Sequence, residues 1–220
     1  MSSAAKDERK SMPLSTEAIL KNNPIVPVVV LEDADHAVPL AHALLEGGIG
    51  LIEITLRTAA GINAISKIAK EVPEIIVGAG TVLSAEQYRQ AMAAGAQYII
   101  SPGLTAEVAE TAAKHNIPFL PGVATASECM QAISYGIPVA KFFPASAIGG
   151  PNLLKQFASV FSKLKFVPTG GIDAKNAKDY LSLPNVVSVG GSWVAPKDAI
   201  AAGDWKKITQ LAKEGLQNIK

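Results

Sequence analysis

A lysine inside an apolar segment is the first residue of this sequence that could do chemistry. Lys141 lies in IPVAKFFPAS (137–146), where most of its neighbours are apolar. Such surroundings disfavour the charged ammonium form, and a neutral amine can attack a carbonyl carbon and form a Schiff base. A lysine that extends its amine to solvent or pairs with an acid is the ordinary alternative. The segment alone leaves both interpretations open.

A glutamate in a second apolar segment could take part in the same chemistry. In LIEIT (51–55), the two-residue period of a strand puts Leu51, Glu53 and Thr55 on one face and the two isoleucines on the other. A carboxylate placed beside Lys141 could move protons during imine formation. The alternative for Glu53 is a structural salt bridge.

Candidate donors for an anionic ligand follow other apolar segments. Arg57 comes two residues after LIEIT, and its planar guanidinium suits a carboxylate or a phosphate. Thr81, in GAGT, can add a hydroxyl donor. Taken alone, Arg57 could equally be a surface arginine and Thr81 a helix cap.

Two glycine pairs predict a phosphate site. PTGGID (168–173) and VGGSW (189–193) each extend from the end of an apolar segment. Glycine lets backbone N–H groups approach an anion closely, and Ser192 can donate from its hydroxyl. One glycine pair would be an ordinary turn, but two after successive segments favour phosphate binding.

Composition and charge exclude several other classes of protein. The 220 residues carry a formal net charge of +1, and no cluster of basic residues points to nucleic acid or to a membrane surface. Cys129 is the only cysteine, so neither an internal disulfide nor a cysteine zinc cluster can form. The histidines and the acids of LEDAD (31–35) belong to helical segments or their starts, so we expect no metal site. A polar beginning and short apolar runs predict a soluble, cytoplasmic protein.

The elements that must position these residues alternate regularly. A short helix is predicted from Ser15 to Asn22, and segments of helical period with capping signals at SAEQ (84–87) and TASE (125–128) follow. Gly95 and Gly136 fall where two of these helices should end. Eight segments rich in valine and isoleucine are predicted to be strands, namely 24–30, 51–55, 75–79, 98–101, 117–121, 139–143, 165–169 and 186–190.

This alternation predicts parallel strands and an α/β fold. Eight units predict a closed (β/α)₈ TIM barrel, a single domain over 14–220 that follows a flexible tail at 1–13. An open doubly wound sheet is the alternative, although VGAGTV (77–82) only approaches the G-x-G-x-x-G pattern of dinucleotide sites. In a barrel, function lies at the carboxyl ends of the strands. Lys141 falls near such an end, whereas Lys165 begins its strand and belongs to the opposite rim.

Six short segments of the sequence match a known protein family in their order and spacing. They are EITLRT (53–58), VGAGTV (77–82), ISPG (100–103), KFFPA (141–145), PTGGI (168–172) and GGSWV (190–194). Together they resemble the 2-keto-3-deoxy-6-phosphogluconate (KDPG) aldolase family, whose members are also called 4-hydroxy-2-oxoglutarate aldolases. The resemblance runs from about Pro24 to near the C-terminus and leaves only the N-terminal tail outside.

The resemblance implies a class I aldolase on a TIM barrel, a homotrimer that needs no metal or other cofactor. It implies that Lys141 is the Schiff-base lysine and that Glu53 is the general acid/base. The binding residues that it implies are Arg57 and Thr81 for a carboxylate, Pro102 and Phe143 for the pocket wall, and Thr169, Gly170, Gly171, Gly190, Gly191 and Ser192 for a phosphate.

The implied substrate is a small phosphorylated keto acid. The expected reaction cleaves KDPG to pyruvate and D-glyceraldehyde 3-phosphate, and also 4-hydroxy-2-oxoglutarate to pyruvate and glyoxylate. One alternative is the galactonate epimer, whose aldolases resemble this chain more loosely. The others are a phosphosugar isomerase or a phosphosugar-binding barrel, neither of which would need both Lys141 and Glu53.

Overall fold

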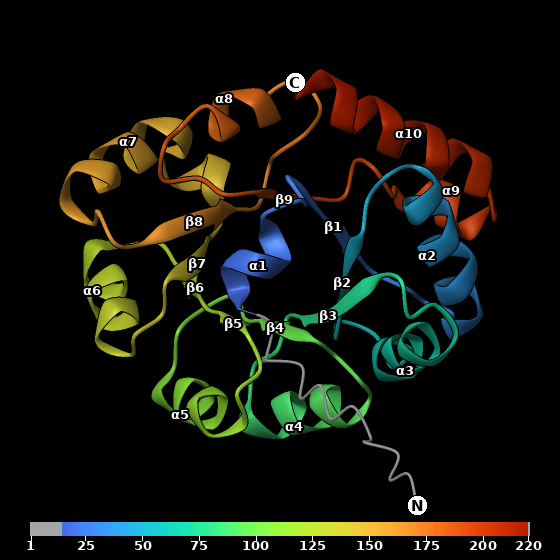
Figure 1. Ribbon diagram of the computed structural model, residues 1–220, viewed down its shortest axis with the longest axis horizontal. Helices are drawn as coiled ribbons and strands as arrows, with labels where there is room; N and C mark the ends of the chain where they lie inside the picture. The colour runs from blue at the N-terminus through green and yellow to red at the C-terminus, as the bar shows by residue number, and fades with distance from the viewer. Residues whose placement is uncertain (1–14, 220) are drawn as a thin grey trace, which may run out of the picture.

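The computed structural model describes residues 15–219. The tail predicted at 1–13 therefore lies outside the described residues. Figure 1 shows a ring of strands surrounded by helices, with α1 in the middle of the ring. This arrangement confirms the predicted TIM barrel.

All eight predicted strands are present, and one of them is divided in two. The predicted strand 117–121 ends early because Pro121 has no N–H to donate, and a second short strand continues after it. The Pro121 carbonyl accepts a 2.8 Å hydrogen bond from the Lys141 N–H instead. The strands are β1 Ile25–Val29, β2 Leu51–Thr55, β3 Ile76–Gly80, β4 Tyr98–Ile100, β5 Phe119–Leu120, β6 Gly122–Val123, β7 Val139–Phe142, β8 Lys165–Pro168 and β9 Val189–Gly191.

The strands pair in parallel around the ring. One sheet has the order β5-β4-β3-β2-β1-β9 and the other has the order β6-β7-β8. Two parallel bridges, Phe166 to Val186 and Thr169 to Gly190, join β8 to the segment that contains β9. The chain itself joins β5 to β6, so the ring closes and the open-sheet alternative is wrong.

Helices of the predicted period cover the outside of the ring. The capping box predicted at Thr125 and Glu128 is present in full. At Ser84 only half of the box forms, because the Gln87 side chain accepts from the Leu83 N–H. The helices are α1 Thr16–Leu20, η1 Ala34–His36, α2 Ala37–Glu46, α3 Gly61–Glu71, α4 Ala85–Ala93, α5 Ala106–His115, α6 Ala126–Ser134, η2 Ala145–Ile148, α7 Gly150–Val160, α8 Ala177–Leu181, α9 Lys197–Ala201 and α10 Trp205–Asn218.

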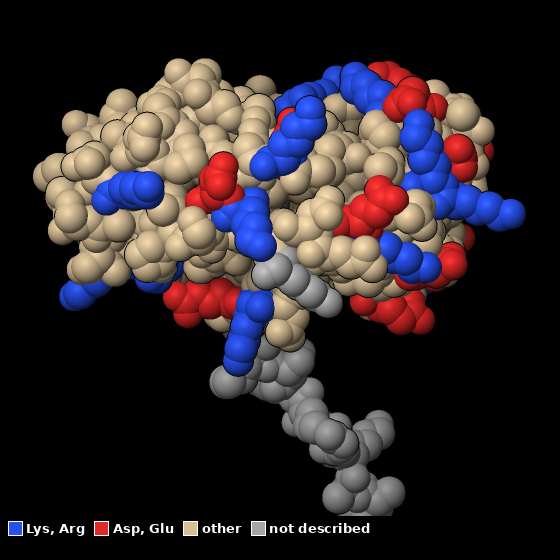
Figure 2. Space-filling model, turned by 90° about the horizontal axis from the view of Figure 1, so that it is seen from above, with Lys and Arg blue, Asp and Glu red and all other residues tan. Residues whose placement is uncertain are grey.

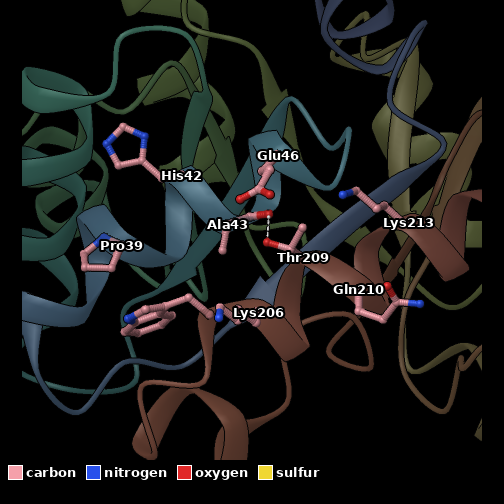
Figure 3. A pocket seen from close by; sticks show the side chains of 9 residues that line it. Pro39, His42, Ala43, Glu46, Lys206, Thr209, Gln210 and Lys213 are labelled. Atoms are coloured by element: carbon pink, nitrogen blue, oxygen red, sulfur yellow. Dashed lines mark hydrogen bonds between the residues drawn. The ribbon is translucent and has the colours of Figure 1, made fainter.

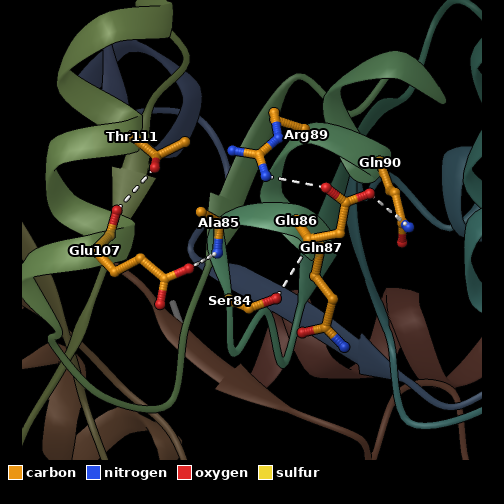
Figure 4. A network of polar contacts seen from close by, with 8 residues as sticks. All are labelled: Ser84, Ala85, Glu86, Gln87, Arg89, Gln90, Glu107 and Thr111. Atoms are coloured by element: carbon orange, nitrogen blue, oxygen red, sulfur yellow. Dashed lines mark hydrogen bonds and ion pairs between the residues drawn. The ribbon is translucent and has the colours of Figure 1, made fainter.

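Polar contacts fix the order of neighbouring helices at the rim. In Figure 4 the Glu107 carboxylate of α5 accepts a 3.0 Å hydrogen bond from the Ala85 N–H, the first residue of α4. Glu86 binds Arg89 and Gln90 on its own helix, each at 3.0 Å. Because the Glu86 contacts are exposed, their charges add little to stability, and the contact from Glu107 is the one that joins two helices.

Two apolar cores lie on the two sides of the strand ring. The larger core fills the space between strands and helices. The smaller one lies inside the ring, where Ile19 and Leu20 of α1 pack against strand residues. The strand side chains of this interior core are Val26, Leu51, Tyr98, Ile100, Leu120, Val139 and Val167.

The outer surface carries charges of both signs. Figure 2 shows lysine and arginine side chains interspersed with aspartate and glutamate on the face above α8 and α10. One contact of this kind joins Lys207 to Asp198 at 3.0 Å. Within residues 15–219, no helix combines the length and the apolar character that crossing a bilayer requires.

Candidate active site

A buried ion pair lies inside the barrel. Lys141 is the third residue of β7 and only 4% exposed, and Glu53 is the third residue of β2 and 1% exposed. The Lys141 Nζ lies 3.4 Å from the Glu53 Oε1. The strand alternation predicted for LIEIT holds, because Leu51 packs in the interior core while Ile52 and Ile54 pack in the outer one.

Two glycines of β3 make room for the side chains of neighbouring strands. A Cβ on Gly80 would lie 2.0 Å from the Glu53 Oε1, so the carboxyl group rests directly on this glycine. A Cβ on Gly78 would lie 2.3 Å from the Tyr98 Cζ, so the tyrosine ring of β4 covers Gly78. The pattern G-A-G in VGAGTV is therefore needed for close packing inside the barrel and not for a dinucleotide.

One predicted wall residue lies near the lysine amine, and the other packs on the strand next to it. The ring centre of Phe143 is 5.4 Å from the Lys141 Nζ. Gly122, the register partner of Lys141, lies so close to the loop after β4 that a Cβ there would be 2.0 Å from the Pro102 oxygen. Both residues follow the carboxyl ends of their strands.

The two predicted carboxylate ligands contact each other at the same end. The Arg57 Nε donates a 3.2 Å hydrogen bond to the Thr81 Oγ1. Thr81 has a φ of +58°, which is uncommon for a β-branched residue and directs its hydroxyl into this contact. The contact joins the loops that follow β2 and β3, and the remaining guanidinium N–H groups can bind an anion.

A cavity of about 520 Å³ opens at the carboxyl ends of the strands. Gly170 and Gly171 have φ values of +102° and +72°, which only glycine adopts without strain. Gly190 lies beneath the cavity, where a Cβ would be 2.3 Å from the Thr169 Oγ1. Seven predicted site residues line the cavity, namely Arg57, Phe143, Thr169, Gly170, Gly171, Gly191 and Ser192.

Comparison with known proteins identifies the family. The model of the family described as KDPG and KHG aldolase matches residues 16–211. The chain belongs to this aldolase family. It is therefore a class I aldolase, a carbon–carbon lyase, and the family predicted from the six segments is confirmed.

Relatives of this aldolase match almost its whole length. The KHG/KDPG aldolase of Escherichia coli (strain K12) is 49% identical over 211 residues, which are 96% of this chain and 99% of the relative. The 2-dehydro-3-deoxy-phosphogluconate aldolase of Dickeya dadantii (strain 3937) is 49% identical over 207 residues, 94% of this chain and 97% of the relative.

Solved structures of other aldolases have the same fold. A KDPG aldolase from Legionella pneumophila, with pyruvate captured as a covalent carbinolamine, is 45% identical, and its TM-score is 0.88 over 90% of this chain and 96% of that one. A native KDPGal structure is only 26% identical, with a TM-score of 0.78 over 89% of this chain and 93% of that one.

A second hollow of the aldolase, about 550 Å³, lies outside the barrel between α2 and α10. Figure 3 shows Lys206 and Lys213 on its rim, together with the hydrogen bond from the Thr209 hydroxyl to the Ala43 carbonyl, 3.0 Å long. His42, one of the histidines that we predicted to bind no metal, lines this hollow. None of the predicted site residues does, so its size does not make it the active site.

Two further groups for which the sequence predicted no metal site are Cys129 and the acids of LEDAD. Cys129 is fully buried on α6, where burial first and Glu128 second raise the pKa of its thiol to about 12. Asp35 of the LEDAD segment pairs with Lys67. Over residues 15–219, no group of three or more histidine, cysteine or acidic side chains is arranged to hold a metal ion.

The sequence interpretation missed three residues of the site. Lys197, the first residue of α9, lines the cavity beside the glycine loops. The Trp193 ring both covers Gly191 and lines the cavity. Tyr98 is level with Glu53 across β3, and its ring covers Gly78. A lysine four residues after VGGSW was the available signal for Lys197, whereas the position of Tyr98 depends on pairing across strands.

Proposed function

We propose that this aldolase cleaves KDPG to pyruvate and D-glyceraldehyde 3-phosphate through a Schiff base on Lys141. We propose that it also cleaves 4-hydroxy-2-oxoglutarate to pyruvate and glyoxylate. The observation that carries the proposal is the distance of 3.4 Å between the Lys141 Nζ and the Glu53 Oε1 in a buried site. An amine that can give its proton to an adjacent carboxylate is ready to act as a nucleophile.

The first stage joins the substrate to the enzyme. Lys141 loses a proton to Glu53, and its free amine attacks the C2 carbonyl carbon of KDPG to give a carbinolamine. Protonation of the C2 oxygen lets it leave as one water molecule, and a protonated imine remains. The positive nitrogen can then accept the electron pair of a neighbouring carbon–carbon bond.

The second stage breaks the C3–C4 bond. Glu53 accepts the proton of the C4 hydroxyl, the C4–O bond becomes a carbonyl, and the C3–C4 electrons move to the imine to give an enamine. D-Glyceraldehyde 3-phosphate leaves. Glu53 returns the proton to C3, and hydrolysis of the imine consumes one water and releases pyruvate, so protons and water balance over the cycle.

The other predicted residues hold the two ends of the substrate. A fixed carboxylate keeps C2 next to the amine, and a bound phosphate supplies binding energy that supports this pose. The residues proposed for these roles are Arg57 and Thr81 at the carboxylate, Pro102 and Phe143 along the wall, and Thr169, Gly170, Gly171, Gly190, Gly191 and Ser192 at the phosphate. Seven of these residues line the cavity at the carboxyl ends of the strands.

Reduction in the presence of pyruvate tests the Schiff base. Borohydride should convert the imine to a stable amine and add one reduced pyruvyl group per chain, located at Lys141 by peptide mass spectrometry. Lys165, which is half-exposed at the opposite rim, is the matched internal control and should remain unmodified. Labelling elsewhere, or none, refutes the assignment of the imine to Lys141.

A side-by-side cleavage assay tests the substrate. KDPG, its galactonate epimer and 4-hydroxy-2-oxoglutarate should be compared by kcat/KM under one set of conditions. We expect KDPG to be preferred, which agrees with 49% identity to a KHG/KDPG aldolase against 26% to the KDPGal structure. Preference for the epimer would replace the proposed substrate and leave the Schiff-base step intact.

We also propose a cytoplasmic homotrimer. A substrate that carries both a carboxylate and a phosphate does not cross a bilayer unaided, so its aldolase should be where the substrate is made. Met130 and Ile133, three residues apart on α6, are 65% and 40% exposed, and such apolar faces are typical of surfaces that bind another protein. Sedimentation equilibrium should give three times the chain mass of 22.9 kDa.

A further inference from the structure

A buried hydroxyl lies inside the barrel without a partner. Tyr98 is 1% exposed in the interior core. Its Oη has no hydrogen-bond partner among residues 15–219. Burying an unpaired hydroxyl costs free energy, and a phenylalanine of the same shape would avoid this cost. Packing alone therefore does not explain why this buried position carries a hydroxyl group.

The register of three strands places Tyr98 level with Glu53, on the other side of β3. Glu53 of β2 is level with Gly78 of β3, and Gly78 is level with Tyr98 of β4. The tyrosine ring covers Gly78, while the Glu53 carboxyl covers Gly80, two residues further along the same face of β3. Tyr98 and the Glu53 carboxyl thus occupy adjacent layers of the barrel interior.

Tyr98 differs from the charged groups around Glu53, because it is a neutral hydroxyl donor. Lys141 approaches the carboxyl from β7, and Arg57, beyond the end of β2, is bonded to Thr81. Burial first, and the negative charge of Glu53 second, hold the pKa of Tyr98 well above its usual value. The hydroxyl therefore keeps its proton at working pH and meets the carboxylate as a donor.

The separation of the two layers suits a single intervening water. Two residues along a strand span about 6.6 Å, which is too far for a direct hydrogen bond between groups at those levels. Two successive O–H···O bonds of about 2.8 Å each cover most of that distance. Internal waters are typically found where buried polar groups would otherwise be unpaired.

We propose that Tyr98 is a positioning residue for Glu53, whose hydroxyl donates through one internal water to the carboxylate and stabilises its proton-accepting form. This inference rests on the proposed function, since it gives Tyr98 a role only if Glu53 transfers protons. Loss of the hydroxyl would make the carboxylate easier to protonate. The acidic limb of the pH–rate profile would then move to higher pH.

Tyr98→Phe tests the inference through proton exchange at the methyl group of pyruvate, followed by NMR in D₂O across pH. We expect the acidic limb to move up by about one half to one pH unit, with the KM for pyruvate unchanged, because the neutral hydrogen bond from the hydroxyl to the bridging water is lost. Tyr88→Phe is the matched control, because the Tyr88 hydroxyl on α4 donates to the Ile117 carbonyl at 3.3 Å, away from the site. The acidic limb of the Tyr88→Phe pH–rate profile should coincide with that of the wild type.

Two further results keep the inference separate from the proposed function. In a Glu53→Gln background, Tyr98→Phe should have no additional effect, because the group it acts on is gone. If Glu53→Gln slows exchange but Tyr98→Phe leaves the acidic limb in place, only the inference is overturned. If Glu53→Gln has no effect, the proposed function fails first.

A crystal structure of the wild type gives a test that needs no variant. Density for a water bonded to the Tyr98 Oη and to a Glu53 oxygen supports the inference, and its absence overturns it.

Discussion

The two ends of the barrel interior differ sharply in chemistry although the same strands build both. At the amino end, Ile19 and Leu20 of α1 pack on Leu51 and Val139 in an apolar cluster. Two residues further along, β2 presents Glu53 and β7 presents Lys141. On these two strands, a step of two residues therefore separates an apolar cluster from the buried ion pair.

This difference assigns stability and activity to different layers. A buried ion pair gains little net stability, because removing two charges from water costs about as much as their attraction returns. The apolar cluster at the amino end stabilises the fold in proportion to the area that it buries. Substitutions at the two ends should therefore affect different properties, and the following predictions test this separation.

Replacing the nucleophile should have the largest effect. Lys141→Met removes the amine that forms the imine, and we expect kcat for KDPG to fall by at least about 10³-fold. Lys165→Met, which removes an amine bonded to the Pro184 carbonyl at the amino end, should keep wild-type kcat. Substantial activity in the folded Lys141→Met protein, with folding checked by circular dichroism, would favour an isomerase-like barrel chemistry.

Glu53→Gln should have the next largest effect. The amide keeps the shape of the side chain but cannot accept a proton, so exchange at the methyl of pyruvate should slow by about 10²-fold or more. NMR in D₂O measures the exchange directly. Glu107→Gln, on a carboxylate that binds only the rim of α4, is the control and should exchange normally. Unchanged exchange in Glu53→Gln would take the proton-transfer role from this residue.

Local patterns were sufficient to predict the elements and most of the site. Alternation in LIEIT correctly put Glu53 on the face opposite Ile52 and Ile54. Glycines of both predicted pairs line the cavity at the carboxyl end, although phosphate binding there remains a prediction. These features depend on periods of two residues or on backbone freedom, which a single sequence displays directly. The family resemblance added the roles of the residues, which remain predictions.

Contacts between distant strands could not be predicted in the same way. Lys141 and Glu53 are 88 residues apart, so their approach follows from closure of the ring and not from either segment. The layer shared by Gly78 and Tyr98 depends on strand register, which has no local signal. The division at Pro121 was missed because proline is compatible with the start, the edge or the end of a strand.

Weakening the apolar cluster at the amino end should lower the stability of the fold without changing catalysis. Leu20 is 2% exposed, so Leu20→Ala should reduce the free energy of unfolding by about 3 kcal/mol, measured by urea titration. The kcat of the folded protein should remain within about twofold of the wild type, because the ion pair lies in the next layer. Val160→Ala, at a side chain that is 69% exposed, is the matched control and should change stability by less than about 0.5 kcal/mol. A large loss of kcat in Leu20→Ala would contradict the separation of the two ends.

The smallest effect is expected at the mouth of the cavity, where Lys197 lies beside Ser192 and the glycine loops. A cation there should attract the phosphate of KDPG more strongly than the singly charged distal carboxylate of 4-hydroxy-2-oxoglutarate, which is also on a shorter chain. Lys197→Ala should therefore raise KM for KDPG by about fivefold, as expected for one exposed charge, and raise KM for the unphosphorylated substrate less. Added salt should reduce the difference between wild type and variant, since salt screens exposed charges. Lys175→Ala, a lysine in the loop before α8 that does not line the cavity, is the control for net charge. Equal losses on both substrates would mean that Lys197 supports the loop structure and does not bind the phosphate.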